Sequence, residues 1–122
     1  MASPLSGPWA RLGELSVLGA RFAVDEINND GGIRALGGAR VRLATVDVGD
    51  SPEKAKTAAE RLLAQEPQLV GGAGAYVSSF TLAVTEVTER ASVPWLTLSY
   101  SDLITNRGFR HVYQTSPTAD DQ

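Results

Sequence analysis

The chain has 122 residues, of which 43% are hydrophobic and 20% charged, a composition typical of one globular domain with its own core. Its net charge of −3 and pI near 5.0 argue against a nucleic-acid partner, which requires a basic face. The absence of cysteine excludes disulfides, thiolate catalysis and zinc–cysteine sites, and no apolar run approaches the roughly 18–20 residues of a membrane span.

The first forty residues predict a loop, a helix and a turn region. Residues 2–11 hold two prolines, two serines and a glycine, which indicates a loop with at most the stub of a strand. Residues 1–4 have no basic region and no apolar core, so we expect no signal peptide in this chain. Residues 12–29 have helical spacing, and the glycines that follow end the helix before a turn region at 33–39.

This first helix is expected to be amphipathic. Its predicted buried face consists of Leu15, Leu18, Phe22, Ala23 and Ile27, and its predicted water-facing residues are Arg21, Asp25 and Glu26.

A strand and a second helix are predicted next. Residues 40–48 alternate apolar and polar side chains, which is typical of a strand that is exposed at its start and buried later. Ser51, Pro52 and Glu53 then form a helix start, with a cap, a proline at the first helical position and an acid in the first turn. This helix is expected to run to about Gln65.

The stretch 69–102 is the centre of the predicted organisation. It reads as a short strand at 69–70, a glycine-rich turn at 71–74, and a helix with serine at its N-cap beginning at Ser78 and Ser79. A strand at 93–98 follows and leads into a hydroxyl-rich loop.

The last part of the chain predicts a short turn at 103–108, a strand at 109–115 and a polar segment at 116–122 that begins a linker or a helix. Helices therefore alternate with strands along the chain. Such alternation predicts an α/β fold, with a doubly wound, mostly parallel sheet flanked by helices on both faces.

A ligand site is expected where two neighbouring strands end. Ligands of open α/β sheets bind at the carboxyl ends of the strands, and a helix N-terminus with free N–H groups favours a carboxylate or a phosphate. The predicted ligand-binding hydroxyls are those of Ser78, Ser79, Ser99 and Ser101. Trp9 and Tyr76 are placed in loops at the same edge, where aromatic rings can form a ligand wall or pack in the core.

Three other interpretations were weighed against this one. Ser78 and Ser79 can serve only as a helix cap. Gly72-x-Gly74 resembles half of a dinucleotide-binding fingerprint, but Val77 occupies the third glycine position and no suitable acid follows, so a nucleotide-dependent enzyme is the weaker alternative. Asp47 and Asp50 follow a strand as a phosphoacceptor would, although a solvated turn and a helix cap account for them.

Catalytic residues and metal ligands are not expected. A phospho-receiver domain needs a lysine at the end of a late strand, whereas the only two lysines, Lys54 and Lys56, lie on the second helix. His111 is the sole histidine and falls in a predicted strand without a serine–acid partnership. The sequence therefore favours a binding domain that uses no cofactor.

Several runs together resemble the type I periplasmic binding proteins, and more narrowly the leucine/isoleucine/valine-binding branch of ABC-transporter substrate-binding proteins. The runs that carry the resemblance are PLSGPWARLGE, GARFAVDEINNDGGIRALGGARVRL, SPEKAKTAAERLL, GAYVSSFTLAV and SDLITNRGFRHVYQTSPTADDQ.

The resemblance implies a two-lobed fold that closes on an amino acid or a similar small ligand. Residues 1–122 would then form part of the N-terminal lobe, with the family's first strand missing before Ala2 and the crossover to a second lobe starting at 116–122. It also implies a membrane permease as partner and a periplasmic or extracytoplasmic location for the full-length protein. A ligand-binding sensory domain of the same fold is the alternative, and self-association of the chain by itself is a further expectation.

Site residues are carried over position by position. Ser78 matches the serine whose hydroxyl and N–H take the ligand carboxylate, and Ser101 matches a ligand-binding hydroxyl residue. Tyr100 falls where the family offers a backbone carbonyl to the ligand ammonium. Leu12 occupies the position of an aromatic contact in the first loop, which makes Trp9 a candidate substitute. A zwitterion bound by hydroxyls, N–H groups and carbonyls needs no net charge, since charge-assisted hydrogen bonds contribute roughly 1.5–3 kcal/mol each.

Overall fold

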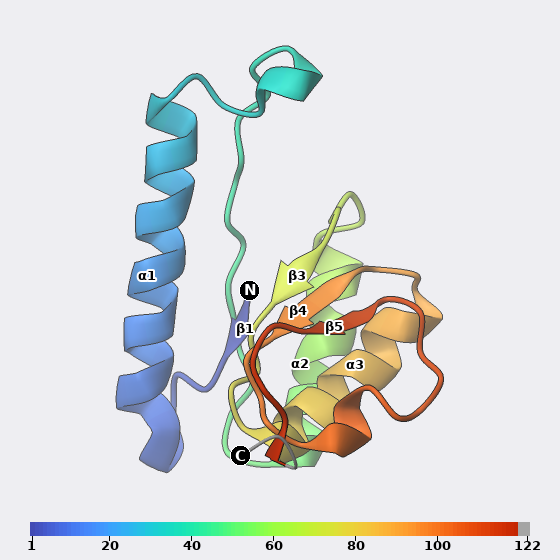
Figure 1. The fold of residues 1–122 in the computed structure, drawn as a ribbon. Coiled ribbons are helices and arrows are strands. Elements are labelled where there is room, and N and C mark those ends of the chain that lie inside the picture. The colour runs from blue at the N-terminus through green and yellow to red at the C-terminus, as the bar shows by residue number, and fades with distance from the viewer. Residues whose placement is uncertain (120–122) are drawn as a thin grey trace.

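The computed structural model describes residues 1–119, and Figure 1 shows a parallel sheet with helices around it. The predicted crossover segment 116–122 therefore lies partly outside the described residues. The five strands are short, and all pair in parallel: β1 pairs with β2, and β3 with β4 and β5. A parallel bridge from Ala2 to Gly74 joins the two groups, so that the strands lie in the order β2-β1-β3-β4-β5. The strands are β1 (Ala2–Ser3), β2 (Val46–Asp47), β3 (Gly72–Ala73), β4 (Trp95–Thr97) and β5 (Val112–Gln114).

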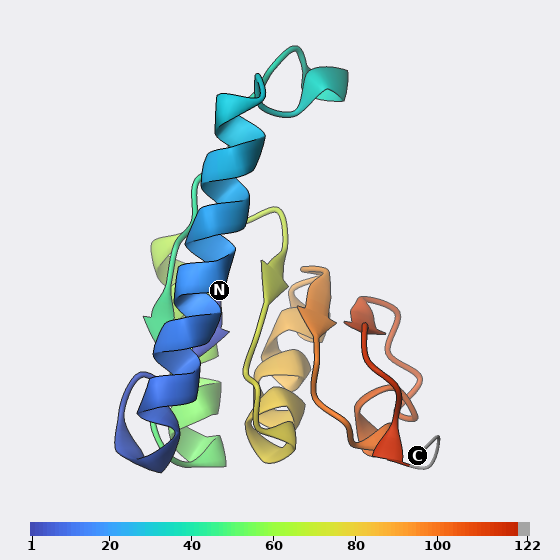
Figure 2. The ribbon, with the colours of Figure 1, turned by 60° about the vertical axis from the view of Figure 1, so that its left-hand side comes forward.

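Helices lie on both faces of this sheet. The first, α1 (Ala10–Asn29), stands on one face, and α2 (Pro52–Gln65) and α3 (Ser78–Arg90) pack against each other on the opposite face (Figure 2). The α/β fold with helices on both faces is thus confirmed. No helix within residues 1–119 combines the length and the apolar character needed to cross a membrane.

The hydrophobic core lies between the sheet and the helices α2 and α3. Trp95 on β4 is fully buried there. Burial of apolar surface is the main favourable term in folding, and most of the buried hydrophobic residues lie in this layer. The other core residues include Val46, Val48, Ala55, Ala58, Ala59, Leu62, Phe80, Val84 and Val87.

The glycine-rich stretch forms a strand, which corrects the prediction of a strand at 69–70 followed by a turn. β3 consists of Gly72 and Ala73, and the preceding Val70 is exposed. A Cβ on Gly72 would lie 2.1 Å from the Trp95 ring, and one on Gly74 would lie 2.0 Å from the carbonyl oxygen of Ala2. Glycine is required here because ring and backbone approach the strand too closely for any side chain.

The buried face of α1 was predicted wrongly. Phe22 and Leu18 are 65% and 64% exposed, and Leu15 and Ile27 also face solvent. The helix instead meets the sheet through Gly13 and Val17, its two buried residues. Helical spacing shows which stripe is apolar, but burial also requires a surface opposite that stripe. Among the described residues no element covers it.

The segment before β2 is extended but mostly unpaired, so the predicted strand 40–48 is reduced to Val46 and Asp47. The side-chain amide of Asn28 fastens its start, donating to the carbonyl of Val41 at 2.9 Å and accepting the Val41 N–H at 2.8 Å. The cap of α2 is confirmed, because the Ser51 hydroxyl accepts the N–H of Lys54 at 3.2 Å.

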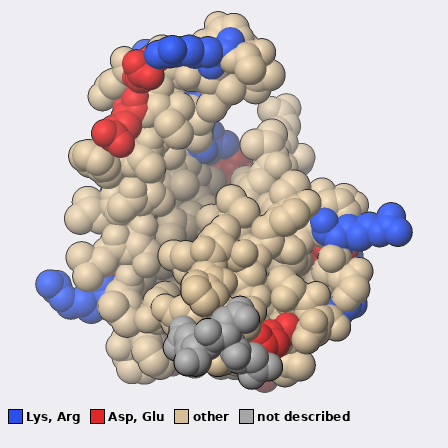
Figure 3. All heavy atoms as spheres, in the orientation of Figure 1, with Lys and Arg blue, Asp and Glu red and all other residues tan. Residues whose placement is uncertain are grey.

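The sheet face that α1 shares remains partly open. Figure 3 shows it as largely free of charged residues, with a hollow between α1 and the sheet. A groove of about 330 Å³ lies there. It is lined by Met1, Ser3, Ser16, Ala73, Gly74, Tyr76, Leu96, Thr97, Leu98 and Thr115.

Candidate ligand-binding site

The loops that leave the carboxyl ends of β1, β3, β4 and β5 meet at one edge of the sheet, the lower edge in Figure 2. The chain turns in opposite directions on either side of the β1–β3 pair, and such a switch point is where open α/β sheets bind ligands. The rings of Trp9, after β1, and Tyr76, after β3, lie there with their centroids 6.3 Å apart. Both side chains are partly exposed, which is consistent with the predicted aromatic wall.

Ser78 and Ser79 open α3, although not as its cap. The N-cap residue is Val77, which makes no side-chain capping bond, and Ser78 is the first helical residue. Within residues 1–119 no hydrogen bond takes the N–H groups or the hydroxyls of Ser78 and Ser79. The backbone N–H groups point along the axis of a 13-residue helix whose N-terminus carries partial positive charge. The start of α3 can therefore accept an anionic group.

Ser99 is placed differently from the prediction. The residue is 1% exposed, and its hydroxyl lies 2.6 Å from that of Thr81, 2.9 Å from that of Thr97 and 2.9 Å from the carbonyl oxygen of Tyr76. A hydroxyl with three partners inside the protein has little capacity for a ligand. Ser99 thus joins the loop after β4 to the loop after β3. The prediction that its hydroxyl contacts a ligand is therefore corrected.

Ser101 and Tyr100 lie in the loop after β4, next to the loop that carries Tyr76. The Ser101 hydroxyl has no hydrogen-bond partner among the described residues. The Tyr100 carbonyl accepts the N–H of Ala119 at 2.9 Å and keeps a second lone pair. The Tyr100 ring is about half exposed.

Gln114 is a residue of this edge that the sequence analysis missed. Its side-chain amide donates to the carbonyl of Ser99 at 2.6 Å and to that of Ser101 at 3.2 Å. It thereby fixes the backbone of the loop after β4 from the neighbouring strand β5. In the sequence, the only indication of this role is an amide side chain at the end of a predicted strand.

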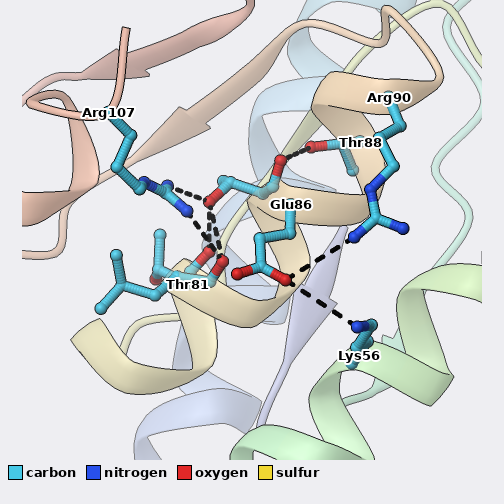
Figure 4. Close-up of polar contacts among 8 residues, drawn as sticks. Lys56, Thr81, Glu86, Thr88, Arg90 and Arg107 are labelled. Carbon is cyan, nitrogen blue, oxygen red and sulfur yellow. Dashed lines mark hydrogen bonds and ion pairs between the residues drawn. The ribbon is translucent and has the colours of Figure 1, made fainter. Parts of the chain in front are cut away.

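Arg107 fastens the same loop to α3 (Figure 4). Its guanidinium donates to the Leu82 carbonyl at 3.1 Å, to the Thr85 hydroxyl at 2.6 Å and to the Ile104 carbonyl at 3.1 Å. It also lies 4.2 Å from the centroid of the Phe109 ring. Burial lowers the pKa of Arg107 from its ordinary value. Among residues 1–119 no carboxylate forms a salt bridge with it, so its part is to hold the loop against the helix.

Asp47 serves as a turn-forming residue, as predicted, and not as a phosphoacceptor. Its carboxylate accepts the N–H groups of Leu5 at 2.9 Å and Gly49 at 2.8 Å. Burial raises the pKa of Asp47, but these N–H donors, together with the Ser6 side chain and the charge of Arg61, outweigh that effect, and the pKa lies below its ordinary value. Within residues 1–119 no group of three histidine or acidic side chains could hold a metal ion.

The geometry thus offers hydroxyls, free helix N–H groups, backbone carbonyls and two aromatic rings at one edge. Such a set suits a small carboxylate or zwitterion better than a cation, because the donors outnumber the charged acceptors. The apolar groove lies beside this edge and shares Tyr76 with it.

Comparison with known proteins agrees with this fold. The family model described as "Periplasmic binding protein" matches residues 1–122. The chain is 38% identical over 119 residues to Leu/Ile/Val-binding protein homolog 7 of Brucella abortus (strain 2308), covering 97% of this chain and 29% of that protein. It is 37% identical over 121 residues to homolog 8 of the same strain, covering 96% and 28%.

Solved structures show the same architecture. The branched-chain amino acid transporter substrate-binding protein LivJ of Streptococcus pneumoniae, in complex with isoleucine, superposes with a TM-score of 0.85 at 26% identity. The match covers 96% of this chain and 32% of that one. The chain therefore spans about a third or less of the proteins it matches.

Proposed function

The chain belongs to the periplasmic binding protein family, and from this premise we propose that it forms part of a substrate-binding component of an ABC transporter for amino acids of the branched-chain type or related small polar solutes. The proposal extends to a membrane permease as partner and to a periplasmic or extracytoplasmic location for the full-length protein. Family membership, relatives with Leu/Ile/Val-binding names and the similarity to LivJ support it.

The observation that carries the proposal is the start of α3. Ser78 and Ser79 present N–H groups and hydroxyls that no described residue takes up, and Ser101 presents a third unpartnered hydroxyl on the adjoining loop. We assign the ligand carboxylate to Ser78 and Ser79, with Ser101 beside it and the Tyr100 carbonyl facing the ammonium. Trp9 and Tyr76 would form the wall against the ligand's apolar side chain.

The test is a titration of the 122-residue chain with leucine, followed by NMR at the amides of residues 76–79. Because one lobe leaves the ligand largely hydrated, we expect weak binding, with a Kd of about 1 mM or more. Ser78→Ala should weaken it by about 1–3 kcal/mol, seen as smaller amide shifts at the same leucine concentration. Ser92→Ala, two residues past the end of α3 and away from this edge, is the control and should bind as the parent chain does.

Two results would refute the assignment. One is equal affinity of the parent chain and Ser78→Ala. The other is micromolar binding by a strictly monomeric chain, which would show that this edge alone encloses the ligand.

The open face of the sheet leads to a second part of the proposal, that the isolated chain self-associates with another copy of itself. Leu18 and Phe22 of α1 face solvent, and an apolar groove lies between α1 and the sheet, on a face with few charged residues (Figure 3). Exposed apolar surface can mark an interaction surface. Sedimentation should show oligomers that Phe22→Ser reduces. A monomer at all concentrations would refute this part.

A further inference from the structure

The backbone between β3 and α3 adopts a conformation that is unusual for its sequence. Ala75 has φ of +61°, in the left-handed region that residues with a side chain seldom occupy. The residue is buried, and its N–H donates to the carbonyl of Ala2 at 2.8 Å. Such a conformation persists only where its surroundings hold it. It matters for the site because the next residues along the chain are Tyr76 and Ser78.

The contact on the other side of this turn comes from α3. The hydroxyl of Thr81, which is fully buried, donates to the carbonyl of Ala75. Among the described residues no other donor reaches that oxygen. Thr81 also contacts the Ser99 hydroxyl at 2.6 Å, and Ser99 in turn contacts Thr97 and the carbonyl of Tyr76. One buried cluster therefore links the turn to the loop after β4.

The hydrogens of this cluster can be counted. The hydroxyls of Thr81, Ser99 and Thr97 carry one hydrogen each, whereas the cluster contains four oxygen–oxygen contacts. Thr97 donates to Ser99, Ser99 donates to the carbonyl of Tyr76, and Thr81 donates to the carbonyl of Ala75, which uses each hydrogen once and leaves none for the contact between Thr81 and Ser99. Thr81 is the donor to Ala75 in this arrangement, and its removal leaves that carbonyl without one.

We infer that Thr81 is a positioning residue for the carboxylate site. Its hydroxyl holds the left-handed turn at Ala75, which aims the start of α3, and it ties that turn to the loop bearing Ser101. The inference rests on the proposed function for its ligand, but the conformation of Ala75 can be measured without one.

The experiment compares three variants of the 122-residue chain by NMR. Thr81→Val keeps the shape and removes the hydroxyl, and Thr81→Ser restores the hydroxyl. Thr88→Val is the matched control, because Thr88 is buried on the same helix, but within residues 1–119 its hydroxyl has only a 3.5 Å contact, to the Thr85 carbonyl (Figure 4). The first readout is the intraresidue HN–Hα NOE of Ala75, which is strong when φ is positive. The second is the affinity for leucine.

We expect Thr81→Val to lose the strong NOE and to bind leucine about fivefold more weakly, the effect of one hydrogen bond. Thr81→Ser and Thr88→Val should keep both. An unchanged Ala75 NOE in Thr81→Val, or equal effects of Thr81→Val and Thr88→Val, would overturn the inference.

The experiment also decides the inference if Thr81→Val does not fold or if the parent chain does not bind leucine. If Thr81→Val does not fold, Thr81→Ala, which also removes the hydroxyl, is judged by the same two readouts. If the parent chain shows no response to leucine, the proposed function fails, and the Ala75 NOE alone decides whether Thr81 holds the turn.

Discussion

A substitution at Gly13 gives the sharpest test of how α1 packs against the sheet. It is one of the two buried residues of that helix, and an added Cβ would lie 1.8 Å from the carbonyl oxygen of Pro4 and 2.7 Å from its carbonyl carbon. These are backbone atoms, so α1 would have to retreat by more than an ångström. That movement would also break the hydrogen bond from the Ser3 hydroxyl to the Gly13 carbonyl, now 3.1 Å long.

The expected magnitude follows from opposing effects. Alanine in place of glycine favours a helix interior by about 1 kcal/mol. Overpacking costs about 1–3 kcal/mol, and the lost hydrogen bond about 1 kcal/mol more. Gly13→Ala should therefore lower the free energy of unfolding by about 1–3 kcal/mol.

Gly19 on the same helix is the matched control. Nothing lies within 4 Å of a Cβ built there, so Gly19→Ala should raise the free energy of unfolding by about 0.5–1 kcal/mol. Urea unfolding followed by far-UV circular dichroism measures both variants. If Gly13→Ala stabilises the chain as much as Gly19→Ala does, α1 does not contact β1 as described.

Two further predictions concern side chains that hold the loops at the carboxyl edge. Asp47→Ala deprives the N–H groups of Leu5 and Gly49 of their acceptor, and should cost about 1–3 kcal/mol of stability near neutral pH. Since the pKa of Asp47 is lowered by folding, its charged form stabilises the fold above the ordinary carboxylate pKa, and this part is lost as the pH falls through the lowered value. The difference between the parent chain and Asp47→Ala in urea unfolding should shrink below about pH 4, and a difference independent of pH would contradict the argument. Arg107→Ala removes the donor that reaches the Thr85 hydroxyl and the carbonyls of Leu82 and Ile104, and should destabilise the chain by about 1–3 kcal/mol. Unchanged amide exchange in the loop after β4 would show that these bonds do not hold the loop.

Local signals in the sequence determined much of this protein. Ser51 and Pro52 marked the start of α2 because capping and a fixed proline φ act within one turn of helix. The strands at 93–98 and 109–115 were found in place, although each pairs over only three residues. The alternation of elements was enough to predict the parallel sheet. The residues around Ser78 placed it at the start of a helix, because the start of a helix depends on neighbouring residues alone.

Tertiary structure decided the features that depend on distant partners. Phe22 is apolar whether or not a surface covers it, so helical spacing could not show that its face lies open. Ser99 and Ser101 look alike in sequence, but the Ser99 hydroxyl contacts Thr81 and the Tyr76 carbonyl from other parts of the chain, whereas the Ser101 hydroxyl has no partner among the described residues. Burial and hydrogen-bond satisfaction are properties of a pair of surfaces, and the second surface is brought into place only when the chain folds.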